Sequence, residues 1–249
     1  MLLKENLTVT YMNNQNNQIL LENILFLDIE TVPLYPSFDD VPETIKPFWI
    51  QKSEHINKEK PAKELYERAG IYAEFGKIVC ISLGRAINKN DHIYIRIKSF
   101  YGHDEKVILN DFFNLISKFN QDNLFLCAHN GKEFDFPYIA RRAIINRIAL
   151  PTILNTSGIK PWEIKHIDTM DMWRFGDYKN FTSLDLLATI FNIPSPKDEI
   201  SGKDIFRVYY EENDLEKIAK YCQKDVLTLI QVYLRYKNLD NIPIKYELV

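Results

Sequence analysis

Cysteine is scarce in this sequence. Only three occur, Cys80, Cys127 and Cys222, and each stands among apolar residues with no second cysteine close by. A disulfide framework or a cysteine-type zinc site requires cysteines paired at short spacing, so neither is supported. We expect three thiols in the protein core.

Long apolar runs are lacking as well. None reaches the roughly 18 residues that a membrane span requires, and the N-terminal segment has no apolar core of a secretory signal. We therefore expect no membrane association and a cytoplasmic location. Residues 12–18 form an amide-rich tract with little to bury, so we expect a flexible N-terminal extension over 1–22.

An excess of positive charge is also missing. The chain has 31 Lys and Arg residues against 34 Asp and Glu residues, which gives a net charge of −3. This balance argues against a broad basic face that coats duplex nucleic acid, but it leaves room for a small electropositive groove. The 249 residues suffice for a sizeable core. We expect one domain over 23–240 and a C-terminal tail over 241–249.

The first half of the chain is dominated by strand patterns. Apolar or alternating runs predict strands at 24–31, 77–83 and 92–100. Prolines between the first two strands indicate an insertion over 33–76, with helical segments near 51–60 and 62–69. We expect the three strands to form an antiparallel meander.

The second half alternates helices with strands. We expect helices at 104–119, 136–147, 183–191, 204–210 and 214–238, and strands at 123–128 and 166–169. A strand, helix, strand passage places its two strands parallel. The sequence therefore predicts an α/β fold with a mixed sheet of about five strands, in which the 24–31 strand is central.

Two acids interrupt that central strand. Successive strand side chains point to opposite faces, so Asp28 and Glu30 must share one face. Two ionised carboxylates in apolar surroundings repel each other and lose hydration, a cost that a bound cation could offset. The alternative is a strand that ends in solvent, with Asp28 or Thr31 capping the next element.

A third acid lies on the buried side of the last helix. Asp225 comes three residues after Cys222 and four before Leu229, both on the apolar stripe, and Tyr221 precedes Asp225 by four residues on the same side. The phenol and the carboxylate can therefore meet near the sheet. The alternative makes Asp225 a border residue paired with a neighbouring lysine, and Tyr221 an ordinary core residue.

Other acids and histidines have structural explanations. Asp135 stands before a proline at a helix start, where a capping residue is expected, although capping and metal binding are not exclusive. Asp168 and Asp171 lie at a strand-to-helix junction, where we also expect capping. His129 and His166 are expected to be hydrogen-bonded scaffold residues, because hard cations prefer carboxylate oxygens.

Three segments together resemble a known family. Leu-Asp-Ile-Glu-Thr at 27–31, the run at 130–135 and Tyr-Cys-Gln-Lys-Asp at 221–225 are similar, in order and spacing, to the motifs of the DEDDy 3′–5′ exonucleases of the ribonuclease H-like superfamily. The linking segments at 69–80, 166–171 and 183–188 resemble the predicted exonuclease domains related to the proofreading domain of family B DNA polymerases. The resemblance covers residues 25–235.

This resemblance implies a site and an activity. It implies Asp28, Glu30, Asp135 and Asp225 as ligands of two Mg²⁺ or Mn²⁺ ions, with Tyr221 positioning the attacking water. As substrate-binding residues we expect Thr31, Asn130 and Phe134. The expected partner is a nucleic acid with a free 3′ end, single-stranded DNA in the first instance, which would be cut to nucleoside monophosphates. RNA remains the alternative substrate, and no polymerase domain is expected in this chain.

Two further classes of function compete. Asp-Ile-Glu-Thr after an apolar strand also resembles the start of haloacid dehalogenase-type phosphatases, but these continue as alternating strands and helices. The second alternative is a non-catalytic module that binds single strands, for which aromatic residues could stack on bases. The aromatic candidates are Phe134, Phe136, Tyr138, Trp162 and Trp173.

Overall fold

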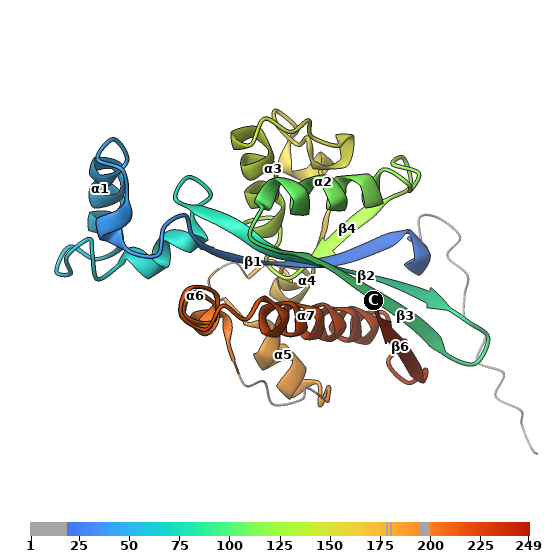
Figure 1. Ribbon diagram of the computed structural model, residues 1–249. Coiled ribbons are helices and arrows are strands. Elements are labelled where there is room, and N and C mark those ends of the chain that lie inside the picture. Colours follow the sequence, from blue (N-terminus) through green and yellow to red (C-terminus); the bar gives the residue numbers. More distant parts are fainter. Residues whose placement is uncertain (1–18, 178, 180, 195–199) are drawn as a thin grey trace, which may run out of the picture.

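The computed structural model describes residues 19–177, 179, 181–194 and 200–249 (Figure 1). The amide-rich tract at 12–18, and with it most of the expected extension at 1–22, lies outside the described residues. In the part of the chain that the structure describes, no helix is both long enough and apolar enough to cross a membrane.

A single sheet runs through the middle of the described structure. Its six strands are β1 (Ile24–Pro33), β2 (Gly76–Asn88), β3 (Ile93–Tyr101), β4 (Phe125–Ala128), β5 (Ile167–Asp168) and β6 (Ile244–Leu248). Their order is β5-β4-β1-β2-β3-β6. Strands β1, β2 and β3 form the expected antiparallel meander, whereas β4 pairs in parallel with β1 and with β5. The central place of β1 is confirmed.

The sheet has one strand more than the expected five. β6 comes from the segment that we expected to be a C-terminal tail, and it pairs in parallel with β3 from Ile93↔Ile244 to Ile97↔Leu248. Its sequence, Ile-Lys-Tyr-Glu-Leu, is short and mostly exposed. A short, exposed strand is held by main-chain hydrogen bonds to its neighbour. Its side chains show little apolar alternation, so the sequence gives only a weak indication of the strand.

Helices cover both faces of the sheet (Figure 1). The α-helices of the described residues are α1 (Lys46–Ile56), α2 (Glu105–Ile116), α3 (Asp135–Ile145), α4 (Thr169–Arg174), α5 (Leu184–Ile190), α6 (Ile205–Arg207) and α7 (Leu215–Tyr236). On β1, Leu25 and Leu27 belong to the core shared with α2 and α3, whereas Phe26 packs with α7. Asp28 and Glu30 follow the alternation of Phe26, so they lie on the α7 face.

The insertion between β1 and β2 packs around a core of its own. Trp49 is fully buried there, and its indole N–H donates to the carbonyl of Ala62 at 2.9 Å. Helix α1 starts at Lys46, earlier than expected, because Pro47 fits the first turn, where no N–H is needed. The second expected helix is instead a 3-10 helix at Tyr66–Ile71. Figure 1 shows α1 projecting away from the sheet.

A buried ion pair ties the α2 and α3 side of the sheet together. The Arg142 guanidinium on α3 donates to both carboxylate oxygens of Glu105 on α2, at 2.6 Å from Nη2 to Oε2 and 2.9 Å from Nε to Oε1. Glu105 also accepts from the main-chain N–H of Ile78 on β2, and Arg142 donates to the carbonyl of Ala73. The two side chains are only 5% and 7% exposed.

We expect Arg142→Met to lower the free energy of unfolding by about 3–5 kcal/mol, because it leaves the Glu105 carboxylate buried without its cation. Glu105→Gln in the Arg142→Met background should recover part of that loss. Urea unfolding of the three proteins measures both effects. A loss near 0–1 kcal/mol, as for exposed ion pairs, would contradict this role.

Candidate active site

The central strand delivers two carboxylates to the α7 face. β1 continues to Pro33, and Glu30 is only 8% exposed, so the strand does not end in solvent after Asp28. Pairing with β2 shifts by one residue between Glu30 and Thr31. Such irregularities re-aim side chains and are frequent beside active sites. The solvent-capping alternative for Asp28 is therefore wrong.

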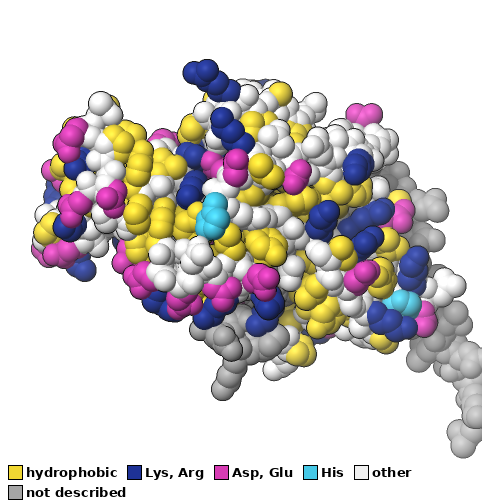
Figure 2. Space-filling model, viewed as in Figure 1, with side chains coloured by type: hydrophobic (Ala, Val, Ile, Leu, Met, Phe, Trp, Pro, Cys, Tyr) yellow, Lys and Arg dark blue, Asp and Glu magenta, His cyan; other side chains and the backbone are white. Residues whose placement is uncertain are grey.

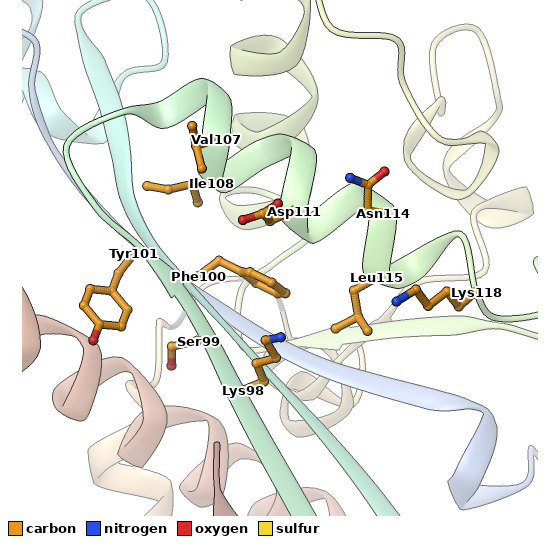
Figure 3. Close-up of a pocket in the computed structure, with 10 residues that line it drawn as sticks. All are labelled: Lys98, Ser99, Phe100, Tyr101, Val107, Ile108, Asp111, Asn114, Leu115 and Lys118. Carbon is orange, nitrogen blue, oxygen red and sulfur yellow. The ribbon is translucent and has the colours of Figure 1, made fainter.

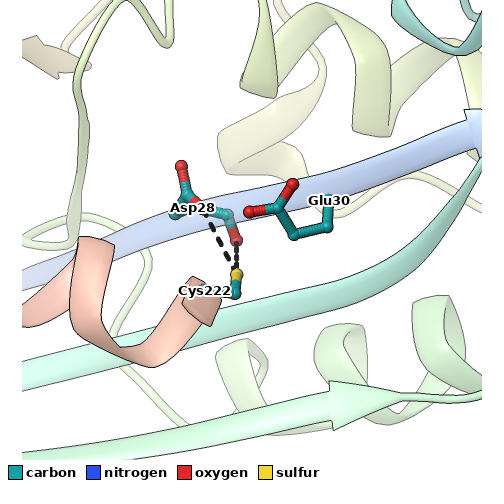
Figure 4. A group of neighbouring side chains, drawn as sticks. All are labelled: Asp28, Glu30 and Cys222. Carbon is teal, nitrogen blue, oxygen red and sulfur yellow. Dashed lines mark hydrogen bonds between the residues drawn. The ribbon is translucent and has the colours of Figure 1, made fainter. Parts of the chain in front are cut away.

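A thiol completes this group. Cys222 on α7 donates to Asp28, with Sγ 3.3 Å from Oδ2 and 3.4 Å from the main-chain oxygen. Asp28, Glu30 and Cys222 each offer a ligand atom, and these atoms lie within 4.8 Å of one another (Figure 4). Cys222 is buried, as expected for a core thiol. We did not expect its contact with Asp28, although its place directly after Tyr221 in the helix stripe was a usable signal.

Burial and mutual repulsion dominate the electrostatics of the site. Burial raises the pKa of Asp28 well above its ordinary range, and the Asp225 and Asp135 carboxylates raise it further. Burial likewise raises the pKa of Glu30, followed by the charges of Asp28 and Asp225. The four acids from three separate segments thus lie close enough to affect one another's ionisation.

Asp135 lies inside the helix and does not cap it. It is the first residue of α3, whose cap position is Phe134, and no side-chain cap bond forms there. Asp135 is 3% exposed, and its Oδ1 atom has no hydrogen-bond partner among the described residues. Burial raises its pKa to about 7, opposed by the main-chain N–H groups of Asp135 and Ile29. A buried oxygen without a partner is energetically costly.

Tyr221 and Asp225 meet on α7 as their spacing predicts. The two side chains share a hydrogen bond, and burial followed by the charges of Asp225, Glu30 and Asp28 raises the pKa of Tyr221 far above its ordinary value. The phenol therefore stays protonated and acts as a donor. Its electrostatic coupling to both strand acids places it at the site and not only in the helix core.

Both neighbouring acids are structural, but only Asp168 has the expected capping role; Asp171 lies inside α4 and forms ion pairs instead. Asp168 caps α4 by accepting from the main-chain N–H groups of Met170 and Asp171. It also accepts from the N–H groups of Asn130 at 2.9 Å and Lys132 at 3.1 Å, so it fixes the turn that leads to Asp135. The carboxylate of Asp171 forms ion pairs with Lys132 and Arg174.

The two histidines differ. His129 is the expected scaffold residue, since its ring nitrogens lie 2.9 Å from Thr169 Oγ1 and 2.8 Å from the carbonyl of Thr182. His166 stacks on Phe136 at 4.3 Å between ring centroids, and neither of its nitrogens has a partner among the described residues. Burial lowers the pKa of His166 to about 4. It therefore serves as a neutral packing residue.

The expected substrate-binding residues lie around the acids. Thr31 follows Glu30 on β1 and shares a side-chain hydrogen bond with Tyr138. Asn130 adopts a left-handed backbone (φ 62°), and its side-chain oxygen is buried without a partner among the described residues. The Phe134 ring lies 5.4 Å from that of Tyr138. Contact between these residues and a substrate stays a prediction.

The aromatic residues considered for base stacking fall into two groups. Phe136 and Tyr138 are buried in the core and cannot stack on bases. Trp162 is 78% exposed, and Phe134 and Trp173 are half-buried. The phosphatase alternative fails on topology, because two antiparallel strands follow β1 where that fold continues with alternating helices and strands.

A family model matches residues 71–242 of the chain. It describes predicted 3′–5′ exonucleases related to the exonuclease domain of PolB. The chain belongs to this family. The matched region includes Asp135, Tyr221 and Asp225, whereas Asp28 and Glu30 precede it. Membership supports exonuclease activity, with a nucleic acid as the class of substrate.

A solved structure agrees in fold. The family B DNA polymerase from the hyperthermophilic archaeon Pyrobaculum calidifontis is similar over 86% of this chain, with a TM-score of 0.51 and 14% sequence identity. The similar region is 24% of the polymerase chain. At this identity the likeness concerns the fold alone, and it supports the expected ribonuclease H-like α/β architecture.

The raised pKa of Asp135 predicts a pH-dependent stability in the absence of metal. The folded protein holds the Asp135 proton more tightly than the unfolded chain, whose carboxyl pKa is near 3.9, so stability is lost as pH rises from about 4 to about 7. Asp135→Asn should remove this loss, and the variant should gain in melting temperature over wild type as pH rises.

Melting curves in EDTA at pH 5 and pH 8 measure this effect on both proteins. An equal difference in melting temperature at the two pH values would contradict the raised pKa of Asp135.

Proposed function

We propose that the protein is a two-metal-ion 3′–5′ exonuclease that removes nucleoside monophosphates from the 3′ end of single-stranded DNA. The observation that carries this proposal is the convergence of Asp28, Glu30, Asp135 and Asp225 in a chain of the PolB-type exonuclease family. RNA is the second substrate to be tested, because contacts that sense a 2′-hydroxyl have no sequence motif here.

The donor set fits two hard divalent cations. Mg²⁺ and Mn²⁺ prefer carboxylate oxygens, and the pKa values of Asp28 and Glu30 are raised by burial and by neighbouring carboxylates, a cost that bound cations would offset. The Oδ1 atom of Asp135 has no partner among the described residues and would be a further ligand atom. When bound, two such ions activate a water and stabilise the leaving oxygen of the phosphodiester. Asp28, Glu30, Asp135 and Asp225 would hold them.

Cys222 has a supporting task in this proposal. A thiol is a poor ligand for Mg²⁺, but the S–H of Cys222 donates to Oδ2 of Asp28. That hydrogen bond fixes the orientation of the Asp28 carboxylate. Cys222 therefore acts as a positioning residue for Asp28.

Tyr221 would orient the attacking water. Because burial and the charge of Asp225 raise its pKa far above the ordinary value, the phenol stays protonated and cannot serve as a base at neutral pH. Its O–H donates to Asp225, so the phenol oxygen would orient the water by accepting a hydrogen bond from it. Asp225 fixes the orientation of this hydroxyl through their shared hydrogen bond. Thr31, Asn130 and Phe134 are proposed to contact the 3′-terminal nucleotide.

Asp28→Asn should abolish divalent-dependent hydrolysis while the protein stays folded, because one of the carboxylates that would hold the ions is lost. The assay uses DNA and RNA oligonucleotides labelled at the 5′ end, in Mg²⁺ or Mn²⁺, and we expect stepwise shortening from the 3′ end. Glu64→Gln, an exposed acid of the insertion, is the control and should keep wild-type activity. A wild-type rate of hydrolysis by Asp28→Asn at saturating metal would contradict the proposed metal centre.

Metal binding can be measured independently of activity, through its effect on the melting temperature. A ligand at 100 times its dissociation constant adds about 2.7 kcal/mol of stability. Mg²⁺ or Mn²⁺ should therefore raise the melting temperature of the wild type and raise that of Asp28→Asn much less. Equal shifts in the two proteins would place the bound ion elsewhere.

Tyr221→Phe should lower kcat on the order of 10²-fold and leave KM and the melting temperature nearly unchanged. The substitution keeps the ring that packs in the helix and removes only the oxygen that meets Asp225. Single-turnover rates and melting curves on the same preparation measure both. Unchanged single-turnover rates would remove Tyr221 from the mechanism, and a deficit that follows a lower melting temperature would make it a packing residue.

A further inference from the structure

The sheet face that carries α2 and α3 is left open beyond the end of α2. A hollow of about 410 Å³ lies there, between the face of β2 and β3 and the residues that follow α2. The residues that line it are Leu25, Leu83, Gly84, Arg85, Ile87, Tyr94, Arg96, Lys98, Leu115, Phe119 and Val249. Three of them are cations, and no aspartate or glutamate occurs among these described lining residues.

Two neighbouring hollows adjoin it, one along α2 and one beside the residues that follow α2. One of about 440 Å³ lies between β3 and α2 and shares Lys98 and Leu115 with the first (Figure 3). Another of about 360 Å³ shares Arg85 and Phe119 with the first and Lys118 with the second. We call this continuous depression the sheet-face groove, defined by Arg85, Tyr94, Arg96, Lys98, Lys118 and Phe119.

The cations of the groove outnumber the acids among its described lining residues. Arg85 and Arg96 are direct cross-strand partners on one face of the sheet, an arrangement that is destabilising for like charges. Arg96 is 61% exposed, and its Nε lies 3.7 Å from Glu247 Oε2. Arg85 donates to a main-chain carbonyl, that of Glu22. Asp111 lines the second hollow and Glu22 the third, and the Tyr94 hydroxyl donates to Glu247. Figure 2 shows Lys and Arg side chains gathered over β3 and the end of α2.

Flat apolar surfaces lie between these charges. The Arg85 guanidinium sits over the Phe119 ring at 5.4 Å, and the Lys98 ammonium over the Phe100 ring at 5.1 Å. Phe119 and Tyr94 are half-buried, so part of each ring faces the groove. Alternating cations and rings match a single-stranded nucleic acid, whose phosphates take the charges and whose bases stack on the rings.

We propose that the sheet-face groove binds single-stranded nucleic acid at a second site, distinct from the acidic centre. Arg85 and Arg96 lie on the α2 face of the sheet, whereas Asp28 and Glu30 lie on the α7 face. The inference rests on the proposed function, which supplies the nucleic-acid substrate. The acidic centre would hold the 3′ end of the strand, and the groove would hold nucleotides farther from that end. A strand that engages both sites is bound more tightly than one that engages either.

The test uses the triple variant Arg85→Gln, Arg96→Gln, Lys98→Gln. A matched control, Lys58→Gln, Lys60→Gln, Arg68→Gln, removes the same charge from exposed positions of the insertion. Fluorescence anisotropy in EDTA measures binding of labelled thymidine oligomers of about 30 nucleotides and about 6 nucleotides, the shorter being the size of one small site.

The groove variant should bind the long oligomer at least about tenfold more weakly. The slope of log K against log salt concentration should be smaller by about two, because three cations are lost and each phosphate contact on a single strand contributes about 0.7. The control should match the wild type. With Mg²⁺, hydrolysis of the short oligomer should be unchanged in the groove variant. Because Arg85 and Arg96 face each other, its melting temperature should stay equal or rise; if the triple variant does not fold, Arg96→Gln alone carries the test.

Equal binding of the long oligomer by wild type and groove variant would overturn the inference. A second result would also overturn it: the groove variant binds the long oligomer as the wild type does, but no longer binds an acidic peptide that the wild type binds. The groove would then be a peptide site. If no oligomer is hydrolysed but the difference in long-oligomer binding persists, the proposed function fails while the groove stands.

Discussion

The mutual repulsion of buried carboxylates on the central strand is the constraint on which the rest of the site depends. β1 is hydrogen-bonded on both edges and packed on both faces, so its alternation cannot be relaxed. A shift by one residue would turn Leu27 and Ile29 out of their core. The fold therefore forces Asp28 and Glu30 onto one face, and α3 and α7 add further acids. Unfavourable charge of this kind is a stability cost that active sites commonly carry.

Close approach of α7 to the sheet makes the second half of the site possible. A Cβ atom at Gly84 of β2 would lie 2.7 Å from Val226 and 2.8 Å from Ile230, both on α7. Glycine at this position lets the helix settle against the strands. Tyr221 and Cys222 then come within reach of residues on β1. A side chain at position 84 would move the helix and the acid it carries.

Sequence reasoning located the features that follow from local periodicity. The shared face of Asp28 and Glu30 and the shared side of Tyr221 and Asp225 follow from strand and helix repeats, and both are present in the structure. The bond between Cys222 and Asp28 joins residues 194 positions apart, and the Arg142–Glu105 pair joins two helices. No periodic signal marks such contacts. The place of Asp135 inside α3 was missed because helix starts are uncertain by a residue or two.

The sixth strand has a consequence for how the molecule meets its neighbours. By pairing with β3, β6 covers main-chain donors and acceptors that would otherwise form an open sheet edge. Such edges are templates on which sheets of separate molecules join. β6 then becomes the outermost strand, and it is short, exposed and charged at Lys245 and Glu247. Short, charged edges resist further pairing, so the last residues of the sheet help to keep copies of this chain apart in concentrated solution.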